Sequence, residues 1–123
     1  MRLPSSLRIK QSRDFARVRS EGVSFPGRYL VLSVLRGAVS SGSGGFQFGL
    51  ITPKRLGTAV MRNKIRRRLR EIVRAHRAEI TGDCLMVVIA RWKSPEATLA
   101  ELDKDWLKLA KKAAILKPPT PAS

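Results

Sequence analysis

The segment between Val60 and Arg77 constrains this chain more than any other, because it carries eight Lys or Arg residues and a single acid, Glu71. On a helical wheel of about 100° per residue, its apolar residues gather on one side. That side consists of Ile65, Leu69, Ile72, Val73, His76 and Ile80. A core would bury such a side, so the pattern predicts an amphipathic helix that ends at the Thr81-Gly82 pair.

One flank of this predicted helix is almost purely basic, whereas Lys64 and Arg68 point elsewhere on the wheel. The flank consists of Asn63, Arg66, Arg67, Arg70, Arg74 and Arg77. Neighbouring like charges destabilise a helix by roughly a few tenths of a kcal/mol per pair, so an anionic partner has to compensate. A guanidinium donates two parallel hydrogen bonds to a phosphate. The flank therefore predicts a nucleic-acid interface.

The charge of the whole chain supports this interpretation. Lys and Arg number 25 against 9 Asp and Glu, which gives a formal net charge of +16. Hydrophobic residues still make up 43% of the sequence, which indicates a folded basic domain and not a disordered tail. The length of 123 residues suffices for one domain. We expect this RNA-binding domain at residues 1–117 and a disordered tail at 118–123.

An anionic membrane is a competing partner for a basic helix, but the apolar side lacks the Trp and Phe typical of interfacial insertion. The segment from Met1 to Arg8 lacks the apolar core of a signal peptide, and no stretch approaches the length needed to span a bilayer. The single cysteine, Cys84, lies in an apolar run and is expected to pack there in a reducing compartment. These features predict a cytoplasmic protein without membrane contact.

The first part of the chain predicts a short helix that Ser12 caps and Gly22 ends. Strands follow where β-branched and aromatic residues gather, and a Ser/Gly run separates them. The strands are expected at 28–35 and 46–52, with an optional short strand at 23–25 and a mobile hairpin loop at 37–45.

The second part predicts a basic turn at 53–57, the arginine helix, and a buried strand at 84–90. Ser94 and Pro95 give a cap and first-turn signal for a last helix that Pro118 stops. Its apolar positions are Leu99, Leu102, Trp106, Leu109 and Ala113. One sheet with helices packed on a face follows, an α/β or α+β two-layer sandwich. The general rule favours a right-handed strand-helix-strand crossover.

Protein-based catalysis requires convergent acids, bases, nucleophiles or metal ligands, and the sequence offers few. The only histidine, His76, lies on the apolar side of the arginine helix, where packing explains it. Glu101, Asp103 and Asp105 are explained by a solvated face of the last helix. We therefore predict no catalytic residue and no metal ligand in the protein.

The segment from Gly49 to Glu71 resembles the signature of the bacterial ribonuclease P protein subunits. The residues in the register of that family are Lys54, Gly57, Ala59, Val60, Arg62, Asn63, Arg67, Arg70 and Glu71. The likeness extends to the Asp14-Phe15 pair, to the strand at Tyr29 and to the segment 83–91. It covers roughly Leu7 to Lys112.

The resemblance implies the RNA-binding subunit of a ribozyme that removes the 5′ leader from precursor transfer RNA. The catalyst is then the RNA, whose Mg²⁺ ions activate the attacking water. The implied partners are the ribonuclease P RNA and the precursor, with one protein monomer per RNA. The family's crossover is left-handed, so the resemblance implies this hand and not the general one.

The resemblance also implies two sets of binding residues. The set that docks on the ribozyme core is Arg62, Asn63, Lys64, Arg66, Arg67, Arg70 and Arg74. The set that binds the leader, in a cleft between the first helix and the sheet, is Phe15, Arg19, Tyr29, Lys54 and Arg55. An aromatic ring stacks on an unpaired base without selecting its identity, while nearby cations hold phosphates.

The chain departs from the family pattern at a few positions. Many relatives have Arg at Lys64 and Lys at Arg66, which redistributes bidentate capacity. Many have an aromatic residue at Arg19 and a hydroxyl residue at Pro53. Two other interpretations stay open at this point: a structural RNA-binding protein of the ribosomal type and a DNA-binding protein of the nucleoid type.

Overall fold

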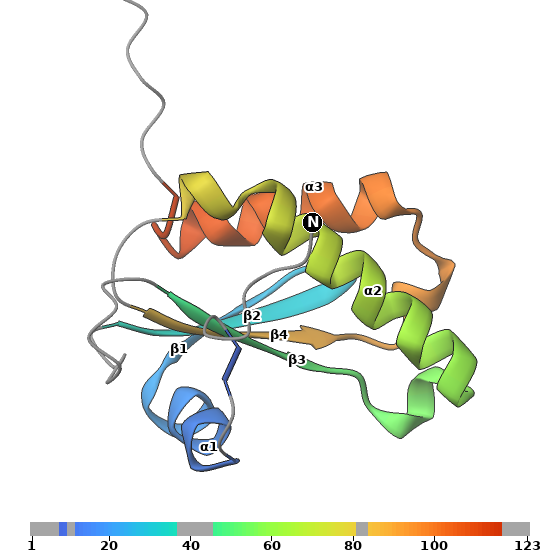
Figure 1. Cartoon of the computed structure of the whole chain (residues 1–123), viewed down its shortest axis with the longest axis horizontal. Helices are drawn as coiled ribbons and strands as arrows, with labels where there is room; N and C mark the ends of the chain where they lie inside the picture. Colours follow the sequence, from blue (N-terminus) through green and yellow to red (C-terminus); the bar gives the residue numbers. More distant parts are fainter. Residues whose placement is uncertain (1–7, 10–11, 37–45, 81–83, 117–123) are drawn as a thin grey trace, which may run out of the picture.

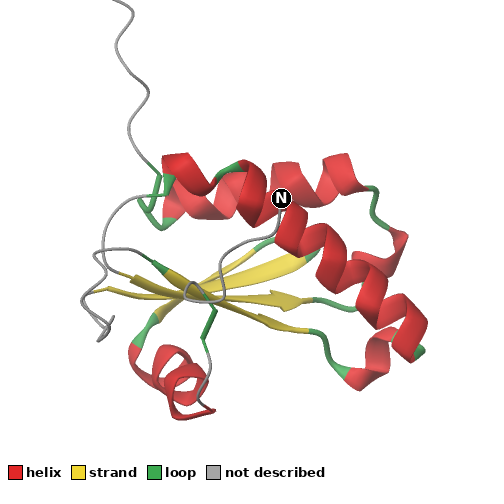
Figure 2. Ribbon diagram, viewed as in Figure 1, coloured by secondary structure: helices red, strands yellow, loops and turns green. Residues whose placement is uncertain are grey.

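The computed structural model describes residues 8–9, 12–36, 46–80 and 84–116. A four-stranded mixed sheet carries helices on both of its faces (Figures 1 and 2). The main elements are α1 (Ser12–Glu21), β1 (Val23–Pro26), β2 (Leu30–Arg36), β3 (Gln47–Ile51), α2 (Ala59–Ala75), β4 (Cys84–Ala90) and α3 (Leu99–Lys112). This order confirms the expected one, including the optional first strand. The predicted loop at 37–45 and tail at 118–123 lie outside the described residues.

The sheet has the order β1-β2-β4-β3, which corrects the expected hairpin between 28–35 and 46–52. β4 pairs antiparallel with β2, opposing Met86 to Val34, and parallel with β3, opposing Val87 to Gly49. The seven residues of β4 are all apolar, and six of them are buried. Only a strand paired on both edges and covered on both faces hides such a run, so β4 separates β2 from β3.

The two faces of the sheet have separate cores. Met86 and other residues of one face pack against α2 and α3 around Leu69 and Trp106. Leu85 of the opposite face packs against Val18 of α1. The α+β class is confirmed, but α1 adds a partial third layer to the expected two-layer sandwich. The crossover from β3 through α2 to β4 is left-handed, as the resemblance implied (Figure 1).

Local capping chemistry fixes where α2 begins. Thr58 caps α2, because its Oγ1 accepts a hydrogen bond from the Met61 amide at 3.2 Å. The helix ends at Ala75, and the short 3₁₀ helix η3 (Arg77–Glu79) follows, so the expected end at Thr81-Gly82 is wrong.

The start of α3 also differs from the prediction. Thr98 and Glu101 form a capping box, so the helix begins at Leu99, and Leu99 itself is exposed. Ser94 and Pro95 instead belong to a separate 3₁₀ helix, η4 (Ser94–Glu96). The capping box of Thr98 and Glu101 could have been predicted from the pattern Thr-x-x-Glu in the sequence.

Asp105 is a structural residue of the sheet and not part of a solvated helix face, which corrects the expectation from sequence. Its carboxylate is buried and accepts hydrogen bonds from the backbone amides of Arg28, Tyr29 and Leu30 at 3.1, 2.9 and 3.0 Å. Gly27 permits this approach, because a Cβ there would lie 2.6 Å from an Asp105 oxygen. Asp105 thereby fixes the start of β2 to α3.

His76 joins α2 to α3, and its expected packing is confirmed. The imidazole stacks on Trp106 with ring centroids 5.4 Å apart. Its Nδ1 lies 2.8 Å from Glu79, and its Nε2 lies 2.7 Å from Asp103. Partial burial opposes protonation, but the two carboxylate hydrogen bonds outweigh it and raise the pKa of His76.

Protonation of His76 should therefore stabilise the fold at acidic pH. A raised folded-state pKa contributes stability that is fully present below the unfolded value of about 6.5 and is lost as pH rises through the folded-state pKa. His76→Phe keeps a ring against Trp106 and removes the titration. In urea unfolding across this pH range, the variant should have a lower free energy of unfolding than the unmodified protein, and the difference should shrink toward alkaline pH. A difference that grows with pH would contradict this linkage.

Candidate nucleic-acid interface

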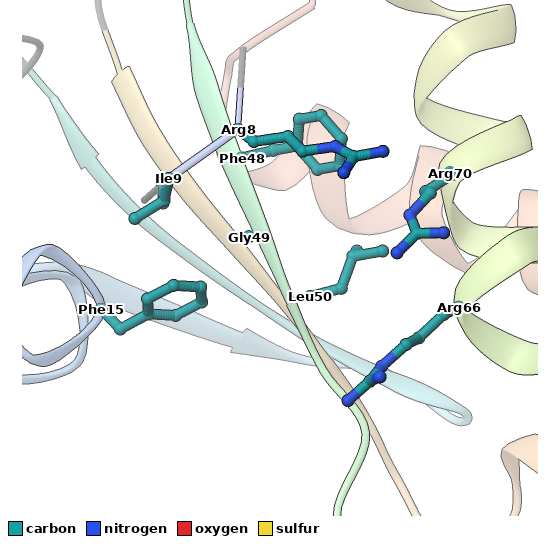
Figure 3. A pocket seen from close by; sticks show the side chains of 8 residues that line it. All are labelled: Arg8, Ile9, Phe15, Phe48, Gly49, Leu50, Arg66 and Arg70. Atoms are coloured by element: carbon teal, nitrogen blue, oxygen red, sulfur yellow. The ribbon is translucent and has the colours of Figure 1, made fainter. Parts of the chain in front are cut away.

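A cleft lies along the outer edge of β3, between α1 and α2 (Figure 3). It consists of two adjoining cavities that share Phe15, Leu50 and Arg66. Figure 3 shows Phe15 on one side of β3 and two arginines reaching from α2 on the other. The edge position of β3 follows from the strand order, because only β4 pairs with it as a full strand. The cleft therefore combines residues from three elements that are distant in sequence.

Phe15 sits directly against the backbone of β3. A Cβ built at Gly49 would lie only 2.3 Å from Phe15 Cε1, so this glycine is what allows the ring to approach the strand. The ring is half-buried and lines both cavities. It is thus held in one place while part of its surface faces the cleft, the arrangement that stacking on a base requires.

Three arginine side chains line the first of the two cavities, which also contains Phe48 and Gly49. Arg66 and Arg70 project from α2, and Arg8 extends over Phe48 (Figure 3). The neighbouring residue of Arg8 is anchored on β3, because the Ile9 amide donates to the Phe48 carbonyl at 2.9 Å. Partial burial and the charges of Arg8 and Arg66 lower the pKa of Arg70. An anion in this cavity would relieve the repulsion, so the geometry favours a phosphate.

The second cavity adds a cation and a buried hydroxyl. Arg19 and Thr52 line it together with Phe15. Thr52 is only 5% exposed, and its Oγ1 has no hydrogen-bond partner within the described ranges. A buried hydroxyl normally has a partner, so this group is available to a ligand in the cavity. Arg19 lines this cavity and is exposed, so its guanidinium is accessible from the solvent.

Two separate polar surfaces lie on α2. Arg66 and Arg70 line the cleft, whereas Asn63, Lys64 and Arg67 are exposed on the outside of the helix. We call these last three the outer flank. The division follows from the wheel, because the cleft-lining pair lies next to the buried side and the outer flank lies farther round.

The remaining cations of the helix have more specific surroundings. Arg74 is bound to Glu71 through Nε and Nη2, which partly neutralises its charge. Arg68 Nη1 donates to the Ala97 carbonyl at 2.9 Å and so ties α2 to the segment before α3. Arg62 is half-buried, and its Nε lacks a partner among the residues that the structure describes. Arg77 belongs to η3 and not to the helix.

Tyr29 is not brought together with Phe15, although both were expected in one cleft. It is 9% exposed and packs in the core on the α3 side, where its hydroxyl donates to Glu101 at 3.1 Å. Burial and this hydrogen bond raise the pKa of Tyr29. Lys54 and Arg55 are exposed on the 3₁₀ helix η2 (Lys54–Leu56), just beyond the end of β3. Thr52, which lines the second cavity, precedes Lys54 by two residues.

Several residues of the cleft were not predicted from the sequence: Arg8, Gly49, Leu50 and Thr52. A lone glycine inside a predicted strand often marks a close approach, so Gly49 gave a usable signal. Arg8 gave none, because only its bridge to Phe48 places it on the edge of β3.

The described part of the chain shows no cluster of three or more His, Cys, Asp or Glu side chains positioned to hold a metal ion. In the same part, none of the helices has the length and apolar character that crossing a membrane requires. The cleft itself presents an aromatic ring, a hydroxyl group and several guanidinium groups.

Comparison with known proteins points to one family. The family model described as Ribonuclease P matches residues 3–114. A ribonuclease P protein component from Syntrophomonas wolfei is 32% identical over 113 residues, covering 92% of each chain. One from Halalkalibacterium halodurans is 35% identical over 111 residues, covering 90% of this chain and 91% of the other.

Solved structures agree with the sequence relatives. The RNase P protein of Staphylococcus aureus shares 30% identity with a TM-score of 0.80, covering 90% of this chain and 98% of the other. The RNase P protein of Thermotoga maritima shares 28% identity with a TM-score of 0.75, covering 85% and 96%. The similarity spans nearly the whole of each protein, so it applies to the entire fold.

Proposed function

The chain belongs to the ribonuclease P protein family, and we propose that its cleft beside β3 binds the single-stranded 5′ leader of precursor transfer RNA. It is the RNA-binding protein component of an endoribonuclease that matures the 5′ end of transfer RNA, and it works with the ribonuclease P RNA. The alternative interpretation, a structural RNA-binding protein of the ribosomal type, is not favoured, because the chain belongs to this family.

The observation that carries the proposal is the position of Phe15. Its ring is fixed against Gly49 inside a cleft that Arg66 and Arg70 border from the opposite side. A strand of RNA in the cleft would stack a base on the ring and place its phosphates near the guanidinium groups. Such contacts tolerate any base sequence, as leaders of different precursors require.

The outer flank is the surface that we assign to the ribonuclease P RNA. Asn63, Lys64 and Arg67 are exposed there, and Arg67 presents a guanidinium fork suited to phosphates. Arg70 lies between this surface and the cleft, and it can serve either RNA. One face of α2 would thus hold the catalytic RNA while the neighbouring face holds the substrate's leader, with one protein monomer per complex.

In this arrangement the catalytic chemistry belongs to the RNA. Magnesium ions held by the RNA supply the activated water. The protein contributes binding energy and positive charge, which offsets the repulsion between two polyanions. With a net charge of +16, the protein should matter most where Mg²⁺ is scarce.

Phe15→Ala tests the leader assignment. Loss of one stacked base should weaken binding of a precursor with an extended leader by about 1–3 kcal/mol, with little effect on mature transfer RNA. Gly49→Ala should act in the same direction, because the new Cβ displaces the Phe15 ring without removing it. Equilibrium titration of the reconstituted complex measures both.

Val23→Ala is a suitable control for the Phe15 test, because Val23 is exposed on β1 and does not line the cleft. It should leave both affinities unchanged. Equal losses for the precursor and for mature transfer RNA in Phe15→Ala would show that the ring supports the fold and does not contact the leader.

A further inference from the structure

The turn that follows β4 exposes a tryptophan. The chain has two tryptophans, and Trp106 is fully buried whereas Trp92 is 62% exposed. An indole provides a large stacking surface, and exposure leaves this surface in water. Trp92 lines none of the cleft cavities described above. Its exposure is thus unexplained by the core or by the cleft.

The turn holds Trp92 in a fixed position. The Arg91 amide donates to the Tyr29 carbonyl at 2.9 Å, and the Arg91 side chain donates to the Gly27 carbonyl at 2.6 Å. On the other side of Trp92, the Ser94 amide donates to the Arg91 carbonyl at 2.9 Å. Because the backbone on both sides is anchored, a ligand that contacts the indole loses little free energy to ordering of the protein chain.

A cation lies against this indole. Lys93 Nζ lies 5.1 Å from the centroid of the Trp92 ring. Tyr29, whose carbonyl anchors the Arg91 amide, has the guanidinium of Arg28 over its ring. An aromatic face bordered by cations is the combination that binds single-stranded nucleic acid.

The turn with Trp92 and the Thr52 end of the cleft lie at the same end of the sheet. β3 and β4 are parallel, with Ile51 opposite Ile89, so the segments after both strands leave from one edge. Lys54 and Arg55 follow β3, and Trp92 follows β4. The cleft runs along β3 from Phe48 to Thr52, and a strand advances about 3.3 Å per residue, so an RNA that follows β3 is directed toward this edge.

We propose that Trp92 stacks on an unpaired base of the leader beyond the cleft, while Lys54 and Lys93 contact the adjoining phosphates. This inference rests on the proposed leader binding by the cleft and extends it by a second stacking site. A leader confined to the cleft would not reach the site. A longer leader would occupy both.

Intrinsic fluorescence tests the contact directly, because Trp92 is the exposed tryptophan. A precursor with a long leader should quench the emission of the holoenzyme's protein, whereas a precursor with a short leader and mature transfer RNA should not. Trp92→Phe should abolish the quench and keep the affinity within about twofold, since a phenyl ring still stacks. The remaining emission of buried Trp106 reports that the fold is intact.

Affinity provides the second measurement. Trp92→Ala should weaken binding of the long-leader precursor about tenfold, within the range for one stacked base, and leave the short-leader precursor unchanged. Val23→Ala, which truncates an exposed apolar residue elsewhere, should change neither affinity. Phe15→Ala should weaken both precursors, provided the short leader still fills the cleft.

These outcomes separate the two ideas. If Phe15→Ala weakens binding but Trp92→Ala does not, the Trp92 site is wrong and the cleft assignment stands. If Phe15→Ala has no selective effect, the cleft assignment itself fails. Quenching by mature transfer RNA alone, or a change in sedimentation of the protein upon Trp92→Ala without any change in RNA affinity, would overturn the proposal in favour of another partner for the indole.

Discussion

Replacement of Arg67 or Arg70 by Ala is expected to weaken binding of the ribonuclease P RNA by about 1–3 kcal/mol each, the range for a good bidentate contact. Each variant should also reduce the slope of log affinity against log salt by about one unit, because one phosphate contact is lost. Arg67 is exposed, so its loss should not disturb the core. The double variant should approach the sum of the two losses.

Lys108→Ala is the matched control for this experiment, because it removes one exposed positive charge from α3, away from the basic flank. Its effect should be clearly smaller. Arg68→Ala should also cost less RNA affinity, although it loses the hydrogen bond to Ala97. Equal losses for Arg67→Ala, Lys108→Ala and Arg68→Ala in a filter-binding titration would show that total charge, and not the flank, binds the RNA.

Asp105→Ala is expected to lower the free energy of unfolding by about 3 kcal/mol, because up to three backbone amides lose their acceptor and unpaired buried donors cost roughly 1–3 kcal/mol each. Water can reach part of the site, since Asp105 is 8% exposed, so the loss should stay below the sum. Urea unfolding should show a lower midpoint for the variant.

Glu96→Ala removes the same charge from an exposed position and should change the unfolding free energy by no more than about 0.5 kcal/mol. Asp105→Asn should be intermediate, because its amide keeps one oxygen acceptor but turns a donor toward the backbone. If Asp105→Ala were as stable as Glu96→Ala, the carboxylate would not be what fixes the start of β2 to α3.

The sequence pattern predicted the elements of this fold better than their arrangement. Periodicity located α2 and an unbroken apolar run located β4, because the burial of each depends on residues close together in sequence. The pairing of β3 with β4 depends on which strand becomes central, which is a competition between distant segments. A loop between two strands is compatible with a hairpin, and only the burial of β4 on both faces excludes it.

The candidate site shows the same limit. The resemblance put Phe15 in a cleft between the first helix and the sheet, and the ring lines a cleft there. Arg66 and Arg70, which the resemblance put in the set that docks on the ribozyme core, line the same cleft. Tyr29 packs in the core instead, since an aromatic residue before a strand looks the same in sequence whether it faces a cleft or a core. The role of Asp105 was missed for a similar reason, because an acid on a helix gives no sign of distant amides.

The most direct test of the account is cleavage of precursor transfer RNA by purified components at varied Mg²⁺ concentration. Nuclease-free protein alone should not cleave. The ribonuclease P RNA with the protein should cleave at low Mg²⁺, where the RNA alone is inactive, and the difference should narrow at high Mg²⁺. Cleavage by the protein without RNA, or equal activity of the RNA with and without the protein at low Mg²⁺, would contradict the account.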